Sequence, residues 1–380
     1  MIVILLILII VLCIPYTIDG INFAKCAFKR RGIGQWNSYS EWSDAVERIN
    51  EKWILNTPTV KKTDNNRMII IDMLKCDYKN NTIQSWQKGL SYLSYIENSD
   101  KDYIHSFLDS NGNWINKPTE IDYSILSFAI LKSAPDKEFI KSAMDVMYNL
   151  IVTKIGDDNT VMYRNSCPNY RFVDTVGFIT PFLACYGITY NKKDAIDLSL
   201  NQLSAYYKYG FDIHSGLPVH VYDIKTFNHL GIYGWGRGAG WYLLGLIDTY
   251  LILKDDQLKS IISSLANQYL IYQNENGSFS PIMQLKDGSD SSITSIMAYY
   301  YSVCADIFEN KLYYDCSKKC LEYLKSVTRK NGEIDYSQGD TKGIGYYSIT
   351  YDIMPFTQGM TCRAINSIRS IEKKYGEFKN

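Results

Sequence analysis

One small motif recurs along the chain: a polar residue, then a glycine or an asparagine, then a short extended piece. It is centred on Gly112, Asn159, Gly216, Gly277 and Gly332, at intervals of 47, 57, 61 and 55 residues. An interval near 55 residues holds two helices and their loops, so each unit is predicted to be a helical hairpin. The stretches between the motifs agree with this, because their apolar residues recur at helical spacing.

Each motif is followed by the start of a helix that is apolar nearly all round, as in a helix buried on both sides. The expected starts, with one more ahead of the first motif, lie near Ser85, Asp122, Asp174, Arg237, Thr294 and Gln358. More amphipathic stretches, such as residues 136–150, would form an outer layer. The sequence therefore predicts an all-α fold, an (α/α)6 barrel of six helical hairpins over residues 33–380. An open array of the tetratricopeptide kind is the alternative, but its repeats are much shorter.

The composition excludes several classes of function. The chain has 40 basic and 40 acidic residues and a net charge of zero, so no surface for nucleic acid is expected. The 4 histidines show no ligand-like spacing, so no metal site is predicted. Glycines at every second position from 234 to 240 do not make a dinucleotide fingerprint, and neither a phosphate loop nor a GxSxG motif occurs.

The N-terminus differs in kind from the rest. Residues 1–15 carry no charged side chain and lack the basic start and small-residue cleavage site of a signal peptide. The run is short for a membrane span, although residues 16–24 extend it. Lys25, Lys29, Arg30 and Arg31 follow, which favours a cytoplasmic position for what comes next. We predict an uncleaved membrane segment over residues 1–24, with its orientation left open.

All inner helices of such a barrel would begin at one end, and the unusual side chains lie at those starts. They include two carboxylates, one guanidinium and several indoles, on Trp86, Asp122, Asp174, Trp235, Arg237 and Trp241. An aspartate before a helix is also a common N-cap, and that alternative stays open for each aspartate singly. Two carboxylates can divide acid and base roles, an arginine binds a planar carboxylate bidentately, and indoles suit sugar rings.

His220 follows the Gly216 motif and would lie near the same rim of the barrel. From spacing alone, contact with a ligand and a structural role in the loop are equally good interpretations of this histidine.

Several segments resemble those of a known enzyme group. WGRGAGW, residues 235–241, is similar to the W-A/G-R-G-N-G-W signature of the unsaturated glucuronyl and rhamnogalacturonyl hydrolases, glycoside hydrolase families 88 and 105. FVDTVGFITPFLA, residues 172–184, and EIDYSILSFAIL, residues 120–131, resemble their aspartate-bearing helices. HVYD, SWQKGLSYL and QGM also occur in the expected order, and the resemblance covers roughly residues 40–375.

The resemblance implies an (α/α)6 barrel and a reaction that uses neither metal nor cofactor. The enzymes of this group release a terminal 4,5-unsaturated uronic acid from lyase-generated oligosaccharides by hydrating its enol-ether double bond. Carried over residue by residue, Asp174 would be the general acid and base, and Asp122 would assist it and hold ring hydroxyls. The substrate-binding side chains would be Trp86, His220, Trp235, Arg237 and Trp241.

The sequence departs from the group at two places. Ala239 stands where Asn or Gln is common, and Tyr163 and Arg164 occupy a region that often carries a histidine. Two alternatives therefore stay open. One is a conventional inverting glycosidase using the Asp122 and Asp174 pair, with carboxyls about 6.5–9.5 Å apart. The other is a membrane-tethered glycan-binding or capsule-associated protein with a degenerate site.

Overall fold

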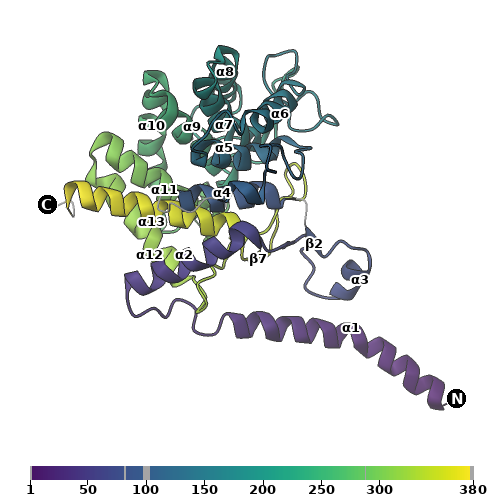
Figure 1. Ribbon diagram of the computed structural model, residues 1–380. Helices are drawn as coiled ribbons and strands as arrows, with labels where there is room; N and C mark the ends of the chain where they lie inside the picture. The colour runs from purple at the N-terminus through teal and green to yellow at the C-terminus, as the bar shows by residue number, and fades with distance from the viewer. Residues whose placement is uncertain (1, 81–82, 97–102, 287, 377–380) are drawn as a thin grey trace.

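The computed structural model describes residues 2–80, 83–96, 103–286 and 288–376, without the side chains of 5–11, 80, 84 and 375. In this part of the chain, helices form two layers (Figure 1). The inner layer has six helices: α4 (Gln84–Ile96), α5 (Ser124–Ser133), α7 (Val173–Thr189), α9 (Gly236–Leu253), α11 (Ser291–Phe308) and α13 (Pro355–Tyr375). Each contacts the next, and α13 contacts α4, which closes the ring.

The outer layer covers the ring with more amphipathic helices. These are α2 (Tyr39–Leu55), α6 (Lys141–Val152), α8 (Lys193–Tyr209), α10 (Asp256–Tyr269) and α12 (Lys311–Ser326). Between α4 and α5, residues 103–123 contain two short 3-10 helices, η1 (Ile104–Ser106) and η2 (Ile121–Tyr123), at the place of a sixth outer helix. Two further 3-10 turns, η3 (Leu270–Tyr272) and η4 (Met283–Leu285), follow α10. The (α/α)6 barrel predicted from the repeat is confirmed.

The local sequence explains where the elements begin and end. All six expected starts lie within three residues of the first residue of an inner helix. The repeated motif is the turn that follows every outer element except α2, and its central residue has a positive φ at all five positions. Such a φ favours glycine and, next, asparagine, which is why these two residues recur there. In α9 every residue from Gly236 to Tyr250 is buried, as expected for an all-round apolar helix.

Short strands lie in the loops that precede the inner helices. β3 (Tyr170–Phe172), β4 (Val221–Asp223) and β5 (His229–Leu230) form one antiparallel sheet, in which Phe172 pairs with Val221. β6 (Ser337–Gln338) pairs with β7 (Tyr351–Asp352), and β1 (Val60–Lys61) pairs with β2 (Lys79–Asn80). Because β3 runs directly into α7, the first sheet fixes the start of that inner helix.

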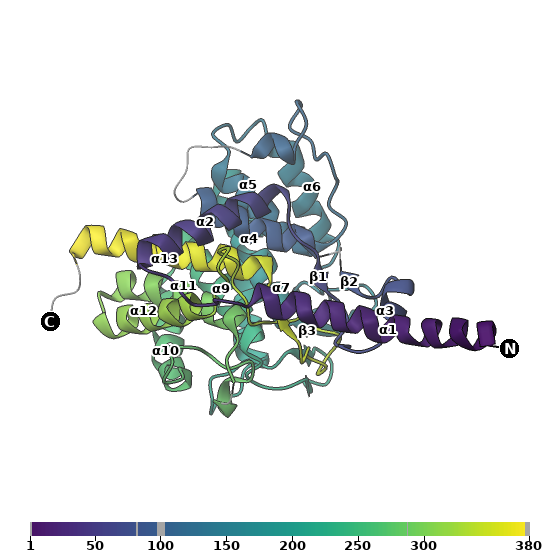
Figure 2. The same cartoon turned by 90° about the horizontal axis from the view of Figure 1, so that it is seen from below.

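The N-terminal helix α1 (Ile2–Lys29) projects away from the barrel in both views (Figures 1 and 2). It packs on the short helix α3 (Ile69–Leu74), where the Asp19 carboxylate accepts hydrogen bonds from the backbone N–H of Met68 and Ile69. The predicted membrane segment, residues 1–24, lies partly outside the described residues. Within the described part, no helix combines the length and the apolar character needed to cross a membrane. Membrane attachment stays a prediction.

Candidate active site

Asp174 and His220 meet at the start of α7. Asp174 lies in the first helical turn, His220 directly precedes β4, and the backbone N–H of Val173 donates to the His220 carbonyl over 3.0 Å. His220 Nε2 lies 3.5 Å from Asp174 Oδ2. That oxygen is buried and has no hydrogen-bond partner among the described residues. The sheet therefore brings two predicted site residues together and leaves one carboxylate oxygen uncommitted.

Tyr347 contacts the other side of His220. Its hydroxyl lies 3.2 Å from His220 Nδ1 and accepts a hydrogen bond from the backbone N–H of Ile232. The Tyr347 ring lies 5.1 Å from the Trp235 ring, which in turn lies 4.7 Å from the His220 ring. If the hydroxyl donates to Nδ1, the imidazole proton sits on Nε2 and faces Asp174. Sequence reasoning did not find Tyr347, although the long loop before the last inner helix was a visible signal.

Arg237 is bound by the last residue of β6 and the residue after it. Its Nη1 and Nη2 atoms donate to the carbonyl oxygens of Gln338 and Gly339, each over 2.7 Å, and its side chain is buried. The guanidinium also lies over the Trp235 ring at 5.4 Å, and the Trp235 indole donates to the side chain of Gln338. These bonds use two of five guanidinium donors, so Arg237 has a structural task beside the predicted one.

The glycines around Arg237 have two different tasks. Gly234 has a φ of 71° and makes the turn before α9. Gly236 lies inside the helix, where an added Cβ would be 2.6 Å from the Ser280 carbonyl oxygen. Gly236 therefore serves close packing of α9 against the chain at Ser280, whereas Gly234 serves the turn. Ala239 is fully buried.

Asp122 is a second buried carboxyl at this end of the barrel. Burial raises its pKa to about 6, while Arg164 acts against this shift and Glu120 adds to it. Arg164 forms an ion pair with Glu120 at 2.6 Å and donates to the Tyr163 hydroxyl. Burial likewise raises the pKa of Tyr163, and the charges of Asp122 and Asp174 add to that effect. Both aspartates therefore lie close enough to act on one hydroxyl.

A third carboxyl, Asp340, was not anticipated from the sequence. It follows Gly339 in the segment held by Arg237. Burial raises its pKa, the charges of Arg237 and Lys342 lower it, and Asp174 raises it. The site thus combines several carboxyls with compensating cations. No group of three or more His, Cys, Asp or Glu side chains in the described chain is arranged to hold a metal.

Trp86 and Trp241 form an aromatic cluster together with Phe178 and Phe356. The two indoles meet edge to face at 5.3 Å, and their side chains are 5% and 2% exposed. Phe178 continues the cluster toward Tyr163, at 5.9 Å between the rings. The structure therefore assigns these tryptophans to a packed aromatic layer that adjoins the polar residues, and their predicted contact with substrate stays a prediction.

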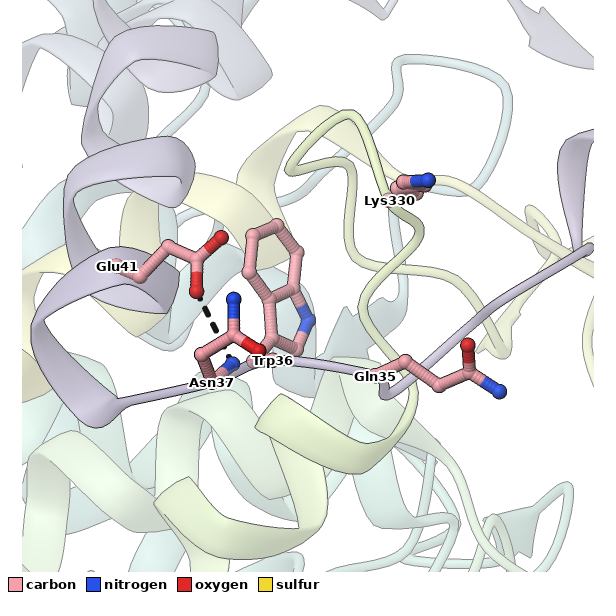
Figure 3. A pocket seen from close by; sticks show the side chains of 5 residues that line it. All are labelled: Gln35, Trp36, Asn37, Glu41 and Lys330. Carbon is pink, nitrogen blue, oxygen red and sulfur yellow. Dashed lines mark hydrogen bonds between the residues drawn. The ribbon is translucent and has the colours of Figure 1, made fainter.

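A cavity of about 450 Å³ lies elsewhere, at the start of α2 (Figure 3). It is lined by Gln35, Trp36, Asn37, Glu41 and Lys330. The Glu41 carboxylate accepts a hydrogen bond from the backbone N–H of Asn37, and the Ser38 hydroxyl, at the N-cap, accepts one from the Glu41 N–H, so Glu41 belongs to the capped start of α2. None of the predicted site residues lines this cavity.

The comparison with protein families decides the assignment. The family model described as Glycosyl Hydrolase Family 88 matches residues 59–369. This chain belongs to glycosyl hydrolase family 88. The family 88 match makes it a glycoside hydrolase and spans every predicted site residue. No curated protein matches the sequence.

Solved structures share the fold of this family 88 chain. A possible member of family GH105 from Klebsiella pneumoniae subsp. pneumoniae MGH 78578 is 13% identical, with a TM-score of 0.71 over 88% of this chain and 95% of that one. The unsaturated glucuronyl hydrolase of Bacillus sp. GL1 is 14% identical, with a TM-score of 0.65 over 89% and 96%. An unsaturated glucuronyl hydrolase specific for heparin is 14% identical, with a TM-score of 0.64 over 89% of this chain and 99% of that one.

Proposed function

We propose that this family 88 hydrolase releases a terminal 4,5-unsaturated uronic acid from lyase-generated oligosaccharides by hydrating the enol-ether double bond. The observation that carries the proposal is the buried, unpartnered Oδ2 of Asp174 beside His220. An oxygen held in place without a partner is suited to exchange a proton with a ligand. Two of the structures that share the fold are titled unsaturated glucuronyl hydrolases, which supports the same substrate class.

In the proposed reaction Asp174 first gives its proton to carbon 4 of the unsaturated ring. The positive charge that develops at carbon 5 is shared with the ring oxygen, and a water adds there while Asp174 takes one of its protons back. The product is a hemiketal at carbon 5, which opens to a ketone. Carbon 1 is then a hemiacetal and expels the remaining saccharide as an alcohol, so one water is consumed and the aspartic acid is restored.

Asp122 would help to keep the required proton at the site. Its raised pKa, about 6, means that Asp122 still holds a proton in weakly acidic solution. A protonated carboxyl also repels the anionic uronate less than a charged one does. Its hydroxyl would further hydrogen-bond ring hydroxyls of the sugar.

The remaining predicted residues would bind the ring. Arg237 supplies positive charge beside Trp235 for the uronate carboxylate, and His220 contributes a donor when Nε2 is protonated. The aromatic layer of Trp86 and Trp241 would support the apolar face of the sugar, since indole faces suit such rings.

The test compares two disaccharides that differ only in the 4,5 double bond of their uronic acid. We expect the full chain to remove the ultraviolet absorbance of the conjugated double bond and to release the second sugar from the unsaturated compound alone. Cleavage of both compounds would instead favour the inverting glycosidase, which has no need of the double bond. Binding of both without cleavage would favour the glycan-binding protein.

We further propose that residues 1–24 attach the enzyme to a membrane. The described part of this segment supports the proposal, because Leu12, Tyr16 and Phe23 are 67%, 73% and 75% exposed. Large apolar side chains exposed together are a feature of membrane or partner contacts. The basic residues Lys25 and Lys29 follow and suit anionic lipid headgroups.

A further inference from the structure

The loop of residues 339–350, between β6 and β7, carries Tyr347 onto His220. Within it the Lys342 N–H donates to the Tyr346 carbonyl, which makes a small turn. Tyr346 and Ile349 are 62% and 78% exposed, so much of the loop does not pack on the barrel. A loop with few buried apolar contacts opens at low free-energy cost unless polar contacts hold it.

Such contacts come from Asp64, in the segment between β1 and α3. The Asp64 carboxylate accepts hydrogen bonds from the hydroxyls of Ser348 and Thr350 and from the backbone N–H of Ile349. The Lys342 ammonium lies 3.9 Å from the same carboxylate. Asp64 is 13% exposed, so these charge-assisted bonds are largely shielded from water. One carboxylate therefore touches the loop on both sides of Tyr347.

The ends of the loop are held separately. Arg30, at the end of the N-terminal helical region, pairs with the buried Asp335 through two bonds of 2.8 Å and donates to the Tyr351 carbonyl over 2.8 Å. These residues lie just before β6 and within β7. The middle of the loop, the part that reaches His220, is held by Asp64 and by the Gln338 side chain, which donates to the Ser348 carbonyl over 2.9 Å.

From these contacts we infer that Asp64 is a positioning residue: its carboxylate holds the loop so that Tyr347 stays on His220 and Trp235. The inference deepens the proposed function and rests on it, because His220 faces the proposed acid Asp174. It assigns a task in the active site to a segment that no site motif of the sequence includes.

Charge interactions through Lys342 also connect Asp64 to the carboxyls of the site. Burial lowers the pKa of Lys342, and the charges of Asp64 and Asp340 both act against this shift. Asp340 in turn feels the charge of Asp174. Removing the charge of Asp64 would leave Lys342 with the Lys62 carbonyl and the charge of Asp340, so the contact at Asp64 is connected to the carboxyls of the site.

The test uses Asp64→Ala, Asp64→Asn and the matched control Asp77→Ala. Asp77 lies between α3 and β2 and pairs with Lys62, two residues before Asp64, at 2.5 Å. In Asp64→Ala we expect amide hydrogen exchange of residues 343–350 to rise about tenfold or more, because hydrogen bonds to a charged group are lost. KM should rise by a similar factor while kcat changes little, since substrate must then select the closed loop. Asp64→Asn keeps an acceptor and should recover most of the protection and of the KM.

Results equal to those of Asp77→Ala overturn the inference, and so does a fall in kcat at constant KM. If Asp64→Ala does not fold, Thr350→Val removes one hydroxyl donor at nearly constant shape. It must shift loop exchange and KM in the same direction, and unchanged values overturn the inference.

Hydrogen exchange is measured without substrate, so it separates the two proposals. If the wild type shows no turnover but loop exchange still rises in Asp64→Ala, the proposed function is refuted and the positioning role of Asp64 stands. Turnover by both proteins with the same KM and the same loop exchange would refute the positioning role of Asp64 and leave the proposed function standing.

Discussion

His220 Nε2 and Asp174 Oδ2 lie 3.5 Å apart, and the aspartate oxygen has no hydrogen-bond partner in the described chain. A contact of this length is longer than a charge-assisted hydrogen bond, which lies near 2.7–2.9 Å. Catalytic hydrogen bonds are often long before substrate binds. The pair is therefore held in position by β3 and β4 while the carboxyl stays able to exchange a proton.

Tyr347→Phe should lower kcat/KM by about tenfold, because the substitution removes the hydroxyl that orients His220. The phenylalanine ring can still pack on Trp235. The midpoint of thermal unfolding should change little. The control is Tyr346→Phe, which removes the hydroxyl of an exposed neighbour. Equal activity of the two variants would show that the Tyr347 hydroxyl has no part in the reaction.

Asp122→Asn should stabilise the protein while it lowers activity. The carboxyl titrates near 6 in the folded chain and near 3.8 when unfolded, so its ionisation disfavours folding by about 3 kcal/mol at pH 7. The amide removes this cost above pH 6, and the gain should shrink as the pH falls toward 4 and vanish below it. Chemical denaturation at pH 7 and pH 4 measures both values. A variant less stable than wild type at pH 7 would contradict the burial argument.

Arg164→Gln should extend activity to higher pH. The proposed acid step depends on the proton that Asp122 keeps at the site, so kcat/KM should fall as the pH rises through about 6. Arg164 stabilises the ionised form of Asp122. Its removal should therefore move the midpoint of this fall to higher pH by about one pH unit. Arg369→Gln, which removes a surface ion pair with Glu47, is the control. A midpoint of this fall that moves to lower pH or stays in place would refute the assignment of the proton to Asp122.

Deleting residues 2–17 should release the protein from membranes without unfolding it. The deletion spares Asp19, which caps α3, and Arg30, which pairs with Asp335. The measurement is the amount of the full chain and of the shortened chain that sediments with cell membranes and stays there after an alkaline carbonate wash. The proposal requires the full chain to remain with the membranes, and recovery of the full chain in the supernatant would refute it.

The barrel was predictable because it is a local property repeated six times. Turn residues such as Gly332 and Asn159, and the apolar helix after each turn, are set by nearby sequence. Asp174 and Asp122 were predictable as site candidates for the same reason, since each lies at the start of an inner helix.

The contacts made by the long loop were not predictable in this way. Tyr347 reaches His220 over 127 residues and Asp64 reaches Ser348 over 284, and no periodicity of the sequence encodes such pairs. Arg237 was expected to face substrate alone, but its bonds to backbone carbonyls depend on where β6 lies. The burial of Trp241 likewise depends on neighbours from three other inner helices.

The most direct measurement is the turnover of an unsaturated uronyl disaccharide by wild type and by Asp174→Asn, followed by the loss of ultraviolet absorbance. The amide can neither give a proton to carbon 4 nor take one from water, so kcat should fall by about a thousandfold or more. Thermal unfolding should show that the variant is folded. Loss of the double bond at the wild-type rate in Asp174→Asn, or no loss with wild type, would contradict the proposed mechanism.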